Sequence, residues 1–268
     1  MQAERFERPK ESGIRSGFYD LDKMTSGFQR SDLVIVAGRP SMGKTSLATD
    51  FSRAMAKQGP GLFLSLEMSS DQLADRNTAA VARVDLQKIR SGKLDKEELA
   101  RIAAAQSELA RMPILVDDEP SMDVGKIHLK LIKNVFRNKI RWMIVDYLQL
   151  IESEGRSRDE EVSKITRKLK QYAKEFNMPI IALSQLNRQC EARSDKKPLL
   201  SDLRESGAIE QDADLIMFVW RGEHYWPEDE NLKGTAEILI RKHRNGPTGT
   251  VTLAWLGQYS SFSNMARR

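Results

Sequence analysis

The sequence of 268 residues contains a single cysteine and only three histidines. Cys190 therefore cannot form an internal disulfide, and His128, His224 and His243 are too widely spaced to suggest a zinc site. Any metal ion that the protein uses is expected to be bound by oxygen ligands.

Long hydrophobic runs are also missing. The longest apolar segments, among them 33–38, 62–66 and 142–145, are far shorter than the ~20 residues that cross a bilayer. The first ten residues carry charges throughout and have no apolar stretch, unlike a secretory signal. We therefore expect a cytoplasmic protein that does not contact a membrane.

The composition indicates a globular protein with a sizeable core. Hydrophobic residues make up 40% of the chain and charged residues 30%, which argues against a disordered or fibrous chain. Lys and Arg number 43 against 38 Asp and Glu, giving a formal net charge of +5. This modest excess is compatible with a polyanionic partner but does not identify one, because it also serves solubility.

Strand-length apolar runs alternate with longer amphipathic stretches over most of the chain. The expected strands are 33–37, 62–66, 114–116, 142–145 and 180–183, and the expected helices start near Lys44, Ser70, Val124 and Glu160. Buried strands separated by helices predict a parallel sheet with both faces covered. Two helical stretches between Ser70 and Met112, broken near Ser91 and Gly92, predict a packed helical insertion.

The pattern changes after Asp214, where three apolar runs follow one another through glycine-containing turns. These runs are 215–220, 236–240 and 250–255. They predict strands added by hairpins. The expected fold class is α/β, with a mainly parallel central sheet flanked by helices and a C-terminal antiparallel extension. Residues 1–13 are polar and are predicted to form an N-terminal arm, while 14–268 form one domain.

Residues 38–45 read Gly-Arg-Pro-Ser-Met-Gly-Lys-Thr and match the G-x-x-x-x-G-K-[ST] phosphate-binding pattern, the P-loop, in full. The match lies between an expected buried strand and an expected helix, where backbone N–H groups can face phosphate oxygens. Lys44 is expected to neutralise β/γ-phosphate charge, and the Thr45 hydroxyl to ligate Mg²⁺. The predicted nucleotide contacts are Ser41, Met42, Gly43, Lys44, Thr45 and Ser46.

Such a site also needs a carboxylate on a second strand to support Mg²⁺. The run 142–145 ends in Asp146, which is the candidate. Glu67, after the run 62–66, is best placed to act as the base that aligns water, because the carboxyl ends of parallel strands meet at one edge.

Two further polar segments allow more than one interpretation. The acidic cluster 117–119 competes with Glu67 as the base, although a solvated turn before Pro120 is the more ordinary interpretation. Gln185, at the end of the run 180–183, can report the presence of the γ-phosphate or can simply be a surface amide.

The ordered set of motifs resembles the C-terminal motor domain of DnaB-type replicative helicases, a RecA-like ATPase family. Besides the P-loop, the segments that carry this resemblance are 17–22, 25–28, 65–68, 145–150, 182–188, 202–214 and 242–249. The resemblance covers the chain from about Ser12 to its end. It implies a RecA-like P-loop fold and a DNA helicase that couples ATP hydrolysis, with Mg²⁺, to 5′-to-3′ movement along single-stranded DNA. It also implies a homo-oligomeric ring, expected to be hexameric.

The resemblance assigns roles to individual residues. Glu67 would be the catalytic carboxylate, and Gln185 would couple nucleotide state to the DNA loops. Lys242 and Arg244 look like the pair that reaches into the neighbouring subunit's site, an arginine finger in trans. A guanidinium supplied across an interface stabilises transition-state charge and makes hydrolysis depend on assembly.

The DNA contacts implied by the resemblance lie in two loops. Arg204, Glu205 and Gly207 resemble the segment that faces the central channel, where a glycine lets backbone N–H groups approach phosphates. Arg156 and Arg158 are the second candidate, although a Gly-Arg-Ser-Arg loop can equally be a solvated one. Residues 1–13 resemble the family's linker and would be an intersubunit arm. Primase and a helicase loader are further possible partners.

Three other functions share the same nucleotide site. A RecA-like recombination ATPase would form filaments, and a non-motor switch or loader scaffold would hydrolyse ATP without responding to DNA. A small-molecule kinase would leave Lys242, Arg244 and the DNA loops without a role.

Overall fold

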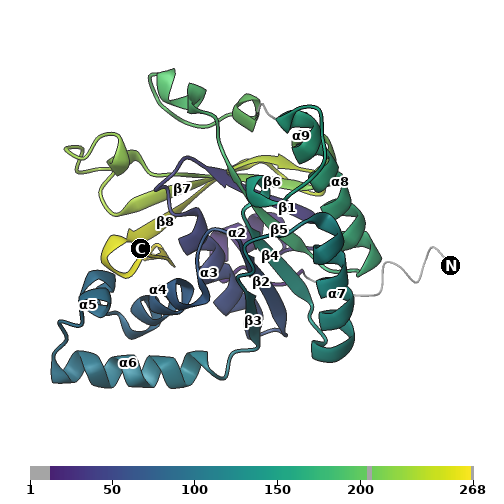
Figure 1. Cartoon of the computed structure of the whole chain (residues 1–268). Helices are drawn as coiled ribbons and strands as arrows, with labels where there is room; N and C mark the ends of the chain where they lie inside the picture. The colour runs from purple at the N-terminus through teal and green to yellow at the C-terminus, as the bar shows by residue number, and fades with distance from the viewer. Residues whose placement is uncertain (1–12, 204–206, 267–268) are drawn as a thin grey trace, which may run out of the picture.

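The computed structural model describes residues 13–203 and 207–266. Within them the chain forms a nine-stranded sheet in the order β3-β2-β4-β5-β1-β6-β7-β8-β9, with helices on both faces (Figure 1). The strands are β1 (Leu33–Gly38), β2 (Gly61–Ser65), β3 (Ile114–Asp117), β4 (Trp142–Asp146), β5 (Ile180–Gln185), β6 (Leu215–Trp220), β7 (Thr235–His243), β8 (Gly249–Leu256) and β9 (Ser261–Asn264). The helices are α2 (Tyr19–Thr25), α3 (Lys44–Ala56), α4 (Ser70–Ala82), α5 (Leu86–Ser91), α6 (Lys96–Leu109), α7 (Val124–Asn138), α8 (Arg158–Glu175) and α9 (Gly207–Asp212).

The sheet is parallel from β3 to β6, and the pairs β6–β7, β7–β8 and β8–β9 are antiparallel. Every residue of β1, β2, β4 and β6 is buried, because helices cover both faces there, and this explains the unbroken apolar runs in the sequence. The predicted α/β class, with its C-terminal antiparallel extension, is confirmed.

Successive side chains along each strand face opposite sides of the sheet and enter two separate cores. Leu33 and Ile35 of β1 pack with residues of α7, α8 and α9 on one side. Val34 and Val36 pack with residues of α2 and α3 on the other side. The two cores fix the sheet between helix layers, so the strand ends that carry polar residues have set positions.

The insertion between β2 and β3 contains three helices, so the prediction of two helical stretches is wrong. The break near Ser91 and Gly92 is present, since Gly92 ends α5 in the left-handed region. The additional break follows α4, where Arg83 adopts φ 52° and Asp85 caps α5 by accepting hydrogen bonds from two backbone N–H groups. Arg83 is not a residue type that indicates a left-handed turn, so this break could not be predicted from the sequence. The insertion has a small core of its own.

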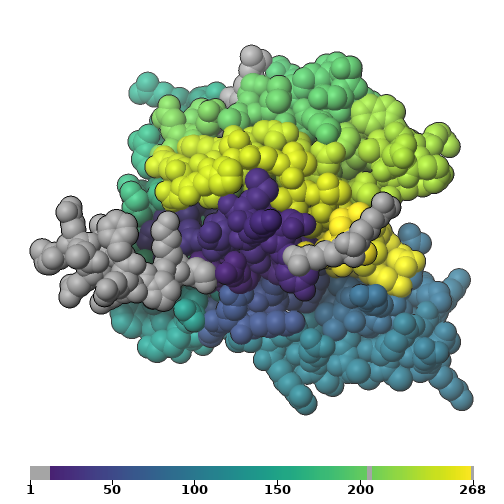
Figure 2. Space-filling view, turned by 180° about the vertical axis from the view of Figure 1, so that it is seen from behind, coloured from purple at the N-terminus to yellow at the C-terminus, as the bar shows by residue number. Residues whose placement is uncertain are grey.

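The first described residues lie against the C-terminal strands, as Figure 2 shows in purple and yellow. The Tyr19 N–H donates to Asn264 Oδ1 at 2.9 Å, and Asn264 Nδ2 donates to the Gly17 carbonyl at 3.1 Å. From β9, the Ser261 hydroxyl and the Phe262 N–H donate to the two oxygens of Asp50 in α3 at 2.8 and 2.7 Å. The N-terminal end of the domain is therefore bonded to β9, and β9 is bonded to α3, the helix that follows the P-loop.

Residues 1–12 of the predicted N-terminal arm lie outside the described residues, so the division at residue 13 stays a prediction. No helix in the two described ranges has the length and apolar character that crossing a membrane requires.

Asp32 immediately precedes β1 and is half-buried near Asp214. Burial, followed by the Asp214 charge, raises the pKa of Asp32 to about 6, although Lys170 and Arg244 act in the opposite direction. Because this pKa lies above the usual value near 3.8, the ionised carboxylate costs stability above pH 6, and that cost disappears as the pH falls towards 4.

Replacement of Asp32 by asparagine tests this penalty. We expect the Asp32→Asn variant to melt at a higher temperature than the parent at pH 8, with the gap closing as the pH falls from about 6 towards 4. Thermal melts monitored by circular dichroism across this range measure the gap, with the exposed Glu228→Gln substitution as the charge-matched control. A gap that stays constant with pH would contradict the assignment.

Candidate nucleotide-binding site

The P-loop connects the C-terminal end of β1 to the start of α3. Gly43 precedes the helix with φ 93°, a left-handed conformation that favours glycine. A Cβ atom at this position would lie 2.8 Å from the Phe262 ring of β9, so the packing also requires glycine. The loop is thus held in shape by a strand from the far end of the chain.

Lys44 and Thr45 occupy the first positions of α3 and face different partners. Lys44 Nζ donates to the carbonyl oxygens of Gly38 and Arg39 at 3.0 and 3.2 Å. The Thr45 hydroxyl donates to Asp146 Oδ2 at 2.7 Å. Burial lowers the pKa of Lys44, while the charges of Asp146 and Glu67 oppose that shift. The ammonium group therefore sits between the loop carbonyls and two acidic side chains.

Asp146 ends β4 and is fully buried. Burial raises its pKa to about 6 and Glu67 adds to the rise, whereas the hydrogen bond from Thr45 lowers it. Its Oδ1 has no hydrogen-bond partner within residues 13–203 and 207–266. A buried carboxylate oxygen without a partner calls for a missing ligand.

These donors fit Mg²⁺, which takes oxygen ligands and keeps several of its sites for water and phosphate. Thr45 and Asp146 are the residues that would hold it. The described residues contain no group of three or more His, Cys, Asp or Glu that could bind a metal ion by themselves. A cation at Thr45 and Asp146 therefore depends on phosphate oxygens as well as on the protein.

Three strand ends meet around a cavity of about 480 Å³ beside the P-loop. Glu67 follows β2, which pairs with β4 so that Ser65 faces Asp146. Gln185 ends β5 and pairs with Gly38 at the end of β1. Lys44, Thr45, Ser46, Glu67 and Gln185 all line the cavity, together with Ser41 and Gly43. The Met42 side chain is instead buried in the core, which leaves only its backbone for a nucleotide contact.

Arg76 of α4 also lines this cavity, and the sequence gave no sign of it. Its Nη1 donates to the Ser260 hydroxyl at 2.9 Å, whereas its Nε is buried without a partner in the described part of the chain. Burial and the nearby Arg90 lower its pKa, while Asp146 and Glu67 act in the opposite direction. A guanidinium with an unused donor is well suited to a phosphate or ribose oxygen.

The C-terminal strands close another side of the cavity. Trp255 of β8 lines it, and the Arg221 guanidinium lies 4.3 Å from the Trp255 ring centroid. Arg221 also donates through Nη1 to the Ser41 carbonyl at 3.0 Å. This contact is a second feature that sequence reasoning missed, since it joins residues 180 positions apart.

The acidic cluster 117–119 lies away from this cavity, at the edge strand β3. Lys130 pairs with both Asp117 and Glu119, and Asp118 accepts a hydrogen bond from the Ser70 N–H at 2.7 Å. The strands β2, β4 and β5 separate β3 from β1. The cluster therefore holds a turn and the start of α4, and Glu67 is the carboxylate next to the P-loop.

Lys242 and Arg244 lie at the opposite end of the sheet from the P-loop. The Arg244 N–H donates to the Asp214 carbonyl, and Asp214 accepts a hydrogen bond from the Leu33 N–H at the start of β1. From Leu33 to Gly38 the strand covers about 17 Å, at ~3.3 Å per residue. An arginine side chain cannot span this distance, so the pair does not belong to the nucleotide site of its own chain.

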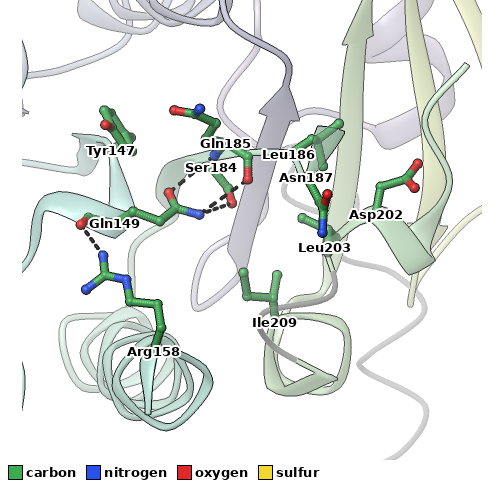
Figure 3. Close-up of a pocket in the computed structure, with 10 residues that line it drawn as sticks. All are labelled: Tyr147, Gln149, Arg158, Ser184, Gln185, Leu186, Asn187, Asp202, Leu203 and Ile209. Atoms are coloured by element: carbon green, nitrogen blue, oxygen red, sulfur yellow. Dashed lines mark hydrogen bonds between the residues drawn. The ribbon is translucent and has the colours of Figure 1, made fainter. Parts of the chain in front are cut away.

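The candidate DNA contacts fall in different places. Arg204 and Glu205 lie outside the described residues, and Gly207 is the exposed first residue of α9. Arg156 is exposed, and its N–H donates to Glu160 at 3.0 Å. Arg158 ion-pairs with Glu161 at 2.7 Å and shares a cavity of about 250 Å³ with Gln185 (Figure 3). Arg158 is the first residue of α8 rather than part of the predicted loop, and the start of this helix is adjacent to the edge of the nucleotide site.

Comparison with known proteins gives a consistent result. The model of the DnaB-like helicase C-terminal domain family matches residues 13–264. Replicative DNA helicase DnaB of Geobacillus stearothermophilus is 46% identical over 263 residues, which cover 96% of this chain and 58% of that protein. Replicative DNA helicase DnaC of Bacillus subtilis is 44% identical, with the same coverage.

Solved structures show the same relationship. The ATPase domain of G40P superposes with a TM-score of 0.93 at 38% identity, covering 99% of this chain and 95% of that one. A DnaB-like replicative helicase, described with its interactions with primase, gives the same TM-score and identity over 99% and 65% of the two chains. These neighbours confirm the predicted RecA-like fold.

Removal of the buried charge at Asp146 should have two opposite effects. An Asp146→Asn variant should melt at least as high as the parent at pH 7.5, because the ionised carboxylate is costly above its raised pKa of about 6. The same variant should lose the gain in nucleotide affinity that Mg²⁺ gives.

Thermal melts and titration of a fluorescent ATP analogue, in Mg²⁺ and in EDTA, measure the two effects. Asp117→Asn at the sheet edge is the control and should keep the Mg²⁺ dependence. An Asp146→Asn protein that still binds nucleotide more tightly in Mg²⁺ than in EDTA would remove Asp146 from the metal site.

Proposed function

The chain belongs to the DnaB-like helicase C-terminal domain family, and we propose that it is the ATP-driven motor of a replicative DNA helicase. It spans 58% of the length of the two curated relatives described above. Unwinding, assembly and partners are therefore proposed from the site and from the family. The comparisons favour neither the recombination filament nor the switch or scaffold.

The observation that supports hydrolysis is the meeting of Lys44, Thr45, Glu67 and Asp146 at one edge of the sheet. Lys44, now bonded to loop carbonyls, can turn its ammonium group to the β- and γ-phosphates of ATP. Mg²⁺, when bound, supplies positive charge at the phosphate oxygens. Thr45 and Asp146 would hold it on the protein side.

Glu67 is proposed to orient the attacking water and to accept its proton. Its position after β2 puts it on the cavity wall beside Lys44 and Gln185. The Gln185 amide can bond to the γ-phosphate or to the water, so its side chain would differ between the nucleotide states. Arg76 would add a positive charge from the helical insertion.

Lys242 and Arg244 are proposed to complete the site of the neighbouring subunit. Their own P-loop is out of reach, at the other end of β1, and the Arg244 side chain is 47% exposed. An arginine that enters the site across an interface stabilises charge in the transition state only in the assembled protein. We therefore propose a homo-oligomeric ring, six-membered as the resemblance implies.

Single-stranded DNA is the proposed track, contacted by Arg204, Glu205 and Gly207 and by Arg156 and Arg158 of the second loop. Contacts of this kind use backbone N–H groups and positive charge rather than base edges, which suits movement without sequence preference. We also propose that the movement is 5′ to 3′, that the protein is cytoplasmic, and that primase and a helicase loader are partners. A primase interaction is described for one structural neighbour.

Steady-state ATP hydrolysis with and without a single-stranded oligonucleotide is the direct test. DNA should raise turnover of the parent chain. The Glu67→Ala variant should lose about 10²-fold or more in turnover under both conditions while still binding nucleotide, because only the proton-transfer step loses its base. Turnover that does not respond to DNA would instead favour the switch or scaffold.

The Arg244→Ala variant tests the action in trans. We expect about a 10³-fold loss of turnover with nearly unchanged nucleotide affinity, the range seen for arginine fingers. Arg241→Ala, in β7 three residues before Arg244, is the matched control and should retain turnover, since the described side chain of Arg241 donates to the Gly249 carbonyl in β8. Full turnover in Arg244→Ala would remove the proposed finger.

A further inference from the structure

We infer that α9 is the support that positions Lys242 and Arg244, and that through it DNA bound by one subunit acts on the nucleotide site of the next. This inference rests on the proposed function, because it takes the trans pair and the DNA loop from there. It adds a positioning element, α9, and a named anchor residue, Ile209, to which neither the sequence nor the resemblance assigned a role.

Both members of the trans pair are bonded to the last turn of α9. Lys242 Nζ donates to the carbonyls of Glu210 and Gln211, and Arg244 Nη2 donates to the Gln211 carbonyl. The last carbonyls of a helix have no partner within it and carry partial negative charge, so cations bind there favourably. The C-terminal end of α9 therefore sets the positions of the Lys242 ammonium group and the Arg244 guanidinium.

Within the described part of the chain, Arg244 is held along one edge of its guanidinium. Its Nε lies 3.7 Å from Asp214 Oδ1, and its described side-chain contacts use Nε and Nη2. A guanidinium has five N–H donors in a fixed plane, so the Nη1 edge remains for a ligand. Arg244 can thus meet a phosphate without leaving α9, and a shift of α9 would move the free edge with it.

Asp214 gives this arrangement a rigid base. Its Oδ2 accepts a hydrogen bond from the Leu33 N–H at 2.9 Å and an ion pair from Lys170, and its side chain is 7% exposed. The Arg244 N–H donates to the Asp214 carbonyl at 2.9 Å. The backbone of the pair is therefore fixed to the start of β1, while α9 holds the two side chains.

The other end of α9 begins at Gly207, the described residue of the proposed DNA loop. The six residues of α9 span about 9 Å, at 1.5 Å per residue. A single short helix thus separates the DNA contact from the carbonyls that hold Lys242 and Arg244. A displacement of Gly207 cannot be absorbed within a helix of this length without moving its last turn.

The segment before the DNA loop is tied to the nucleotide edge of the same subunit. Asp202 is buried, ion-pairs with Arg193 and accepts a hydrogen bond from the Leu199 N–H at 2.7 Å. The Asn187 N–H, two residues after Gln185, donates to the Asp202 carbonyl at 3.2 Å. Figure 3 shows Gln185, Asp202 and Ile209 around the same cavity. Asp202 therefore anchors the chain ahead of the DNA loop, whereas the last turn of α9 contacts the trans pair.

Ile209 is the residue that fixes α9 to the body. It is 1% exposed and packs in the core on the α8 side of the sheet. An Ile209→Ala substitution loosens the packing of α9 but leaves Lys242, Arg244 and Asp214 unchanged. Ile127→Ala in α7 is the matched control, since Ile127 is equally buried in the same core and lies in a different helix.

The test uses mixed assemblies of two inactive variants of the 268-residue chain. One chain carries Glu67→Ala and keeps its trans pair, and the other carries Arg244→Ala and keeps its catalytic site. Turnover in the mixture then comes only from interfaces where the intact Glu67 site of one chain meets the intact Lys242 and Arg244 of the other. Ile209→Ala is placed first on the chain that supplies the pair and then on the chain that supplies the site, and stimulation by a single-stranded oligonucleotide is measured each time.

We expect Ile209→Ala on the chain that supplies the pair to lower DNA stimulation by about 3- to 10-fold, the range of coupling changes measured along such networks. On the chain that supplies the site, and for Ile127→Ala on either chain, stimulation should stay close to that of the parent mixture. Should the alanine variant melt below the assay temperature, Ile209→Val is placed in the same two chains with the same expected asymmetry.

Equal losses in both placements, or no loss in either, would overturn the role of α9 while leaving the trans pair intact. A parent mixture with no turnover at all would remove the trans pair itself, and the inference with it. The two failures are distinguishable because the parent mixture is measured without any change in α9.

Discussion

The hydrogen bond from Thr45 to Asp146 joins the P-loop helix to the centre of the sheet, and the site is built around it. A carboxylate is held at the fully buried end of β4 although burial raises its pKa. The parallel register that aligns Ser65 with Asp146 and Gly38 with Gln185 then fixes the neighbouring side chains around this charge. The second carboxylate oxygen has no partner in the described residues, and under the proposed function it would meet the cation that neutralises this buried charge.

The features that follow from local pattern could be predicted from the sequence. The P-loop, the buried strands and the acid after each strand are short-range signals, and the parallel sheet brings the strand ends together wherever the loops run. Features that depend on distant segments could not be predicted. Arg76 reaches the cavity because α4 folds back over the P-loop, and Phe262 determines the shape of the loop from the last strand. The break at Arg83 depends on a backbone conformation that its residue type does not favour.

The sheet separates two half-sites. The P-loop lies at the carboxyl end of β1, and Lys242 and Arg244 are fixed near its amino end through Asp214. If Lys242 and Arg244 act as proposed, one chain carries both parts of a catalytic centre but cannot bring them together. Under the proposed action in trans, this separation would make hydrolysis depend on the interface between subunits, and α9 would affect turnover through the two cations that it holds.

The contacts between the two ends of the domain have a mechanical consequence. Arg15 exchanges two hydrogen bonds with Gln58, just after α3, and Gly17 and Tyr19 are bonded to Asn264 of β9. Strand β9 is in turn bonded to Asp50 of α3 and packs its Phe262 ring against Gly43. Tension on the backbone at Gly13 is therefore carried first by the bonds of Gly13 and Ile14 to Ser26 and Phe28, and next by the bonds to Gln58 and Asn264. A load that passes these first bonds reaches α3 through Gln58 and β9 through Asn264, and both elements support the P-loop.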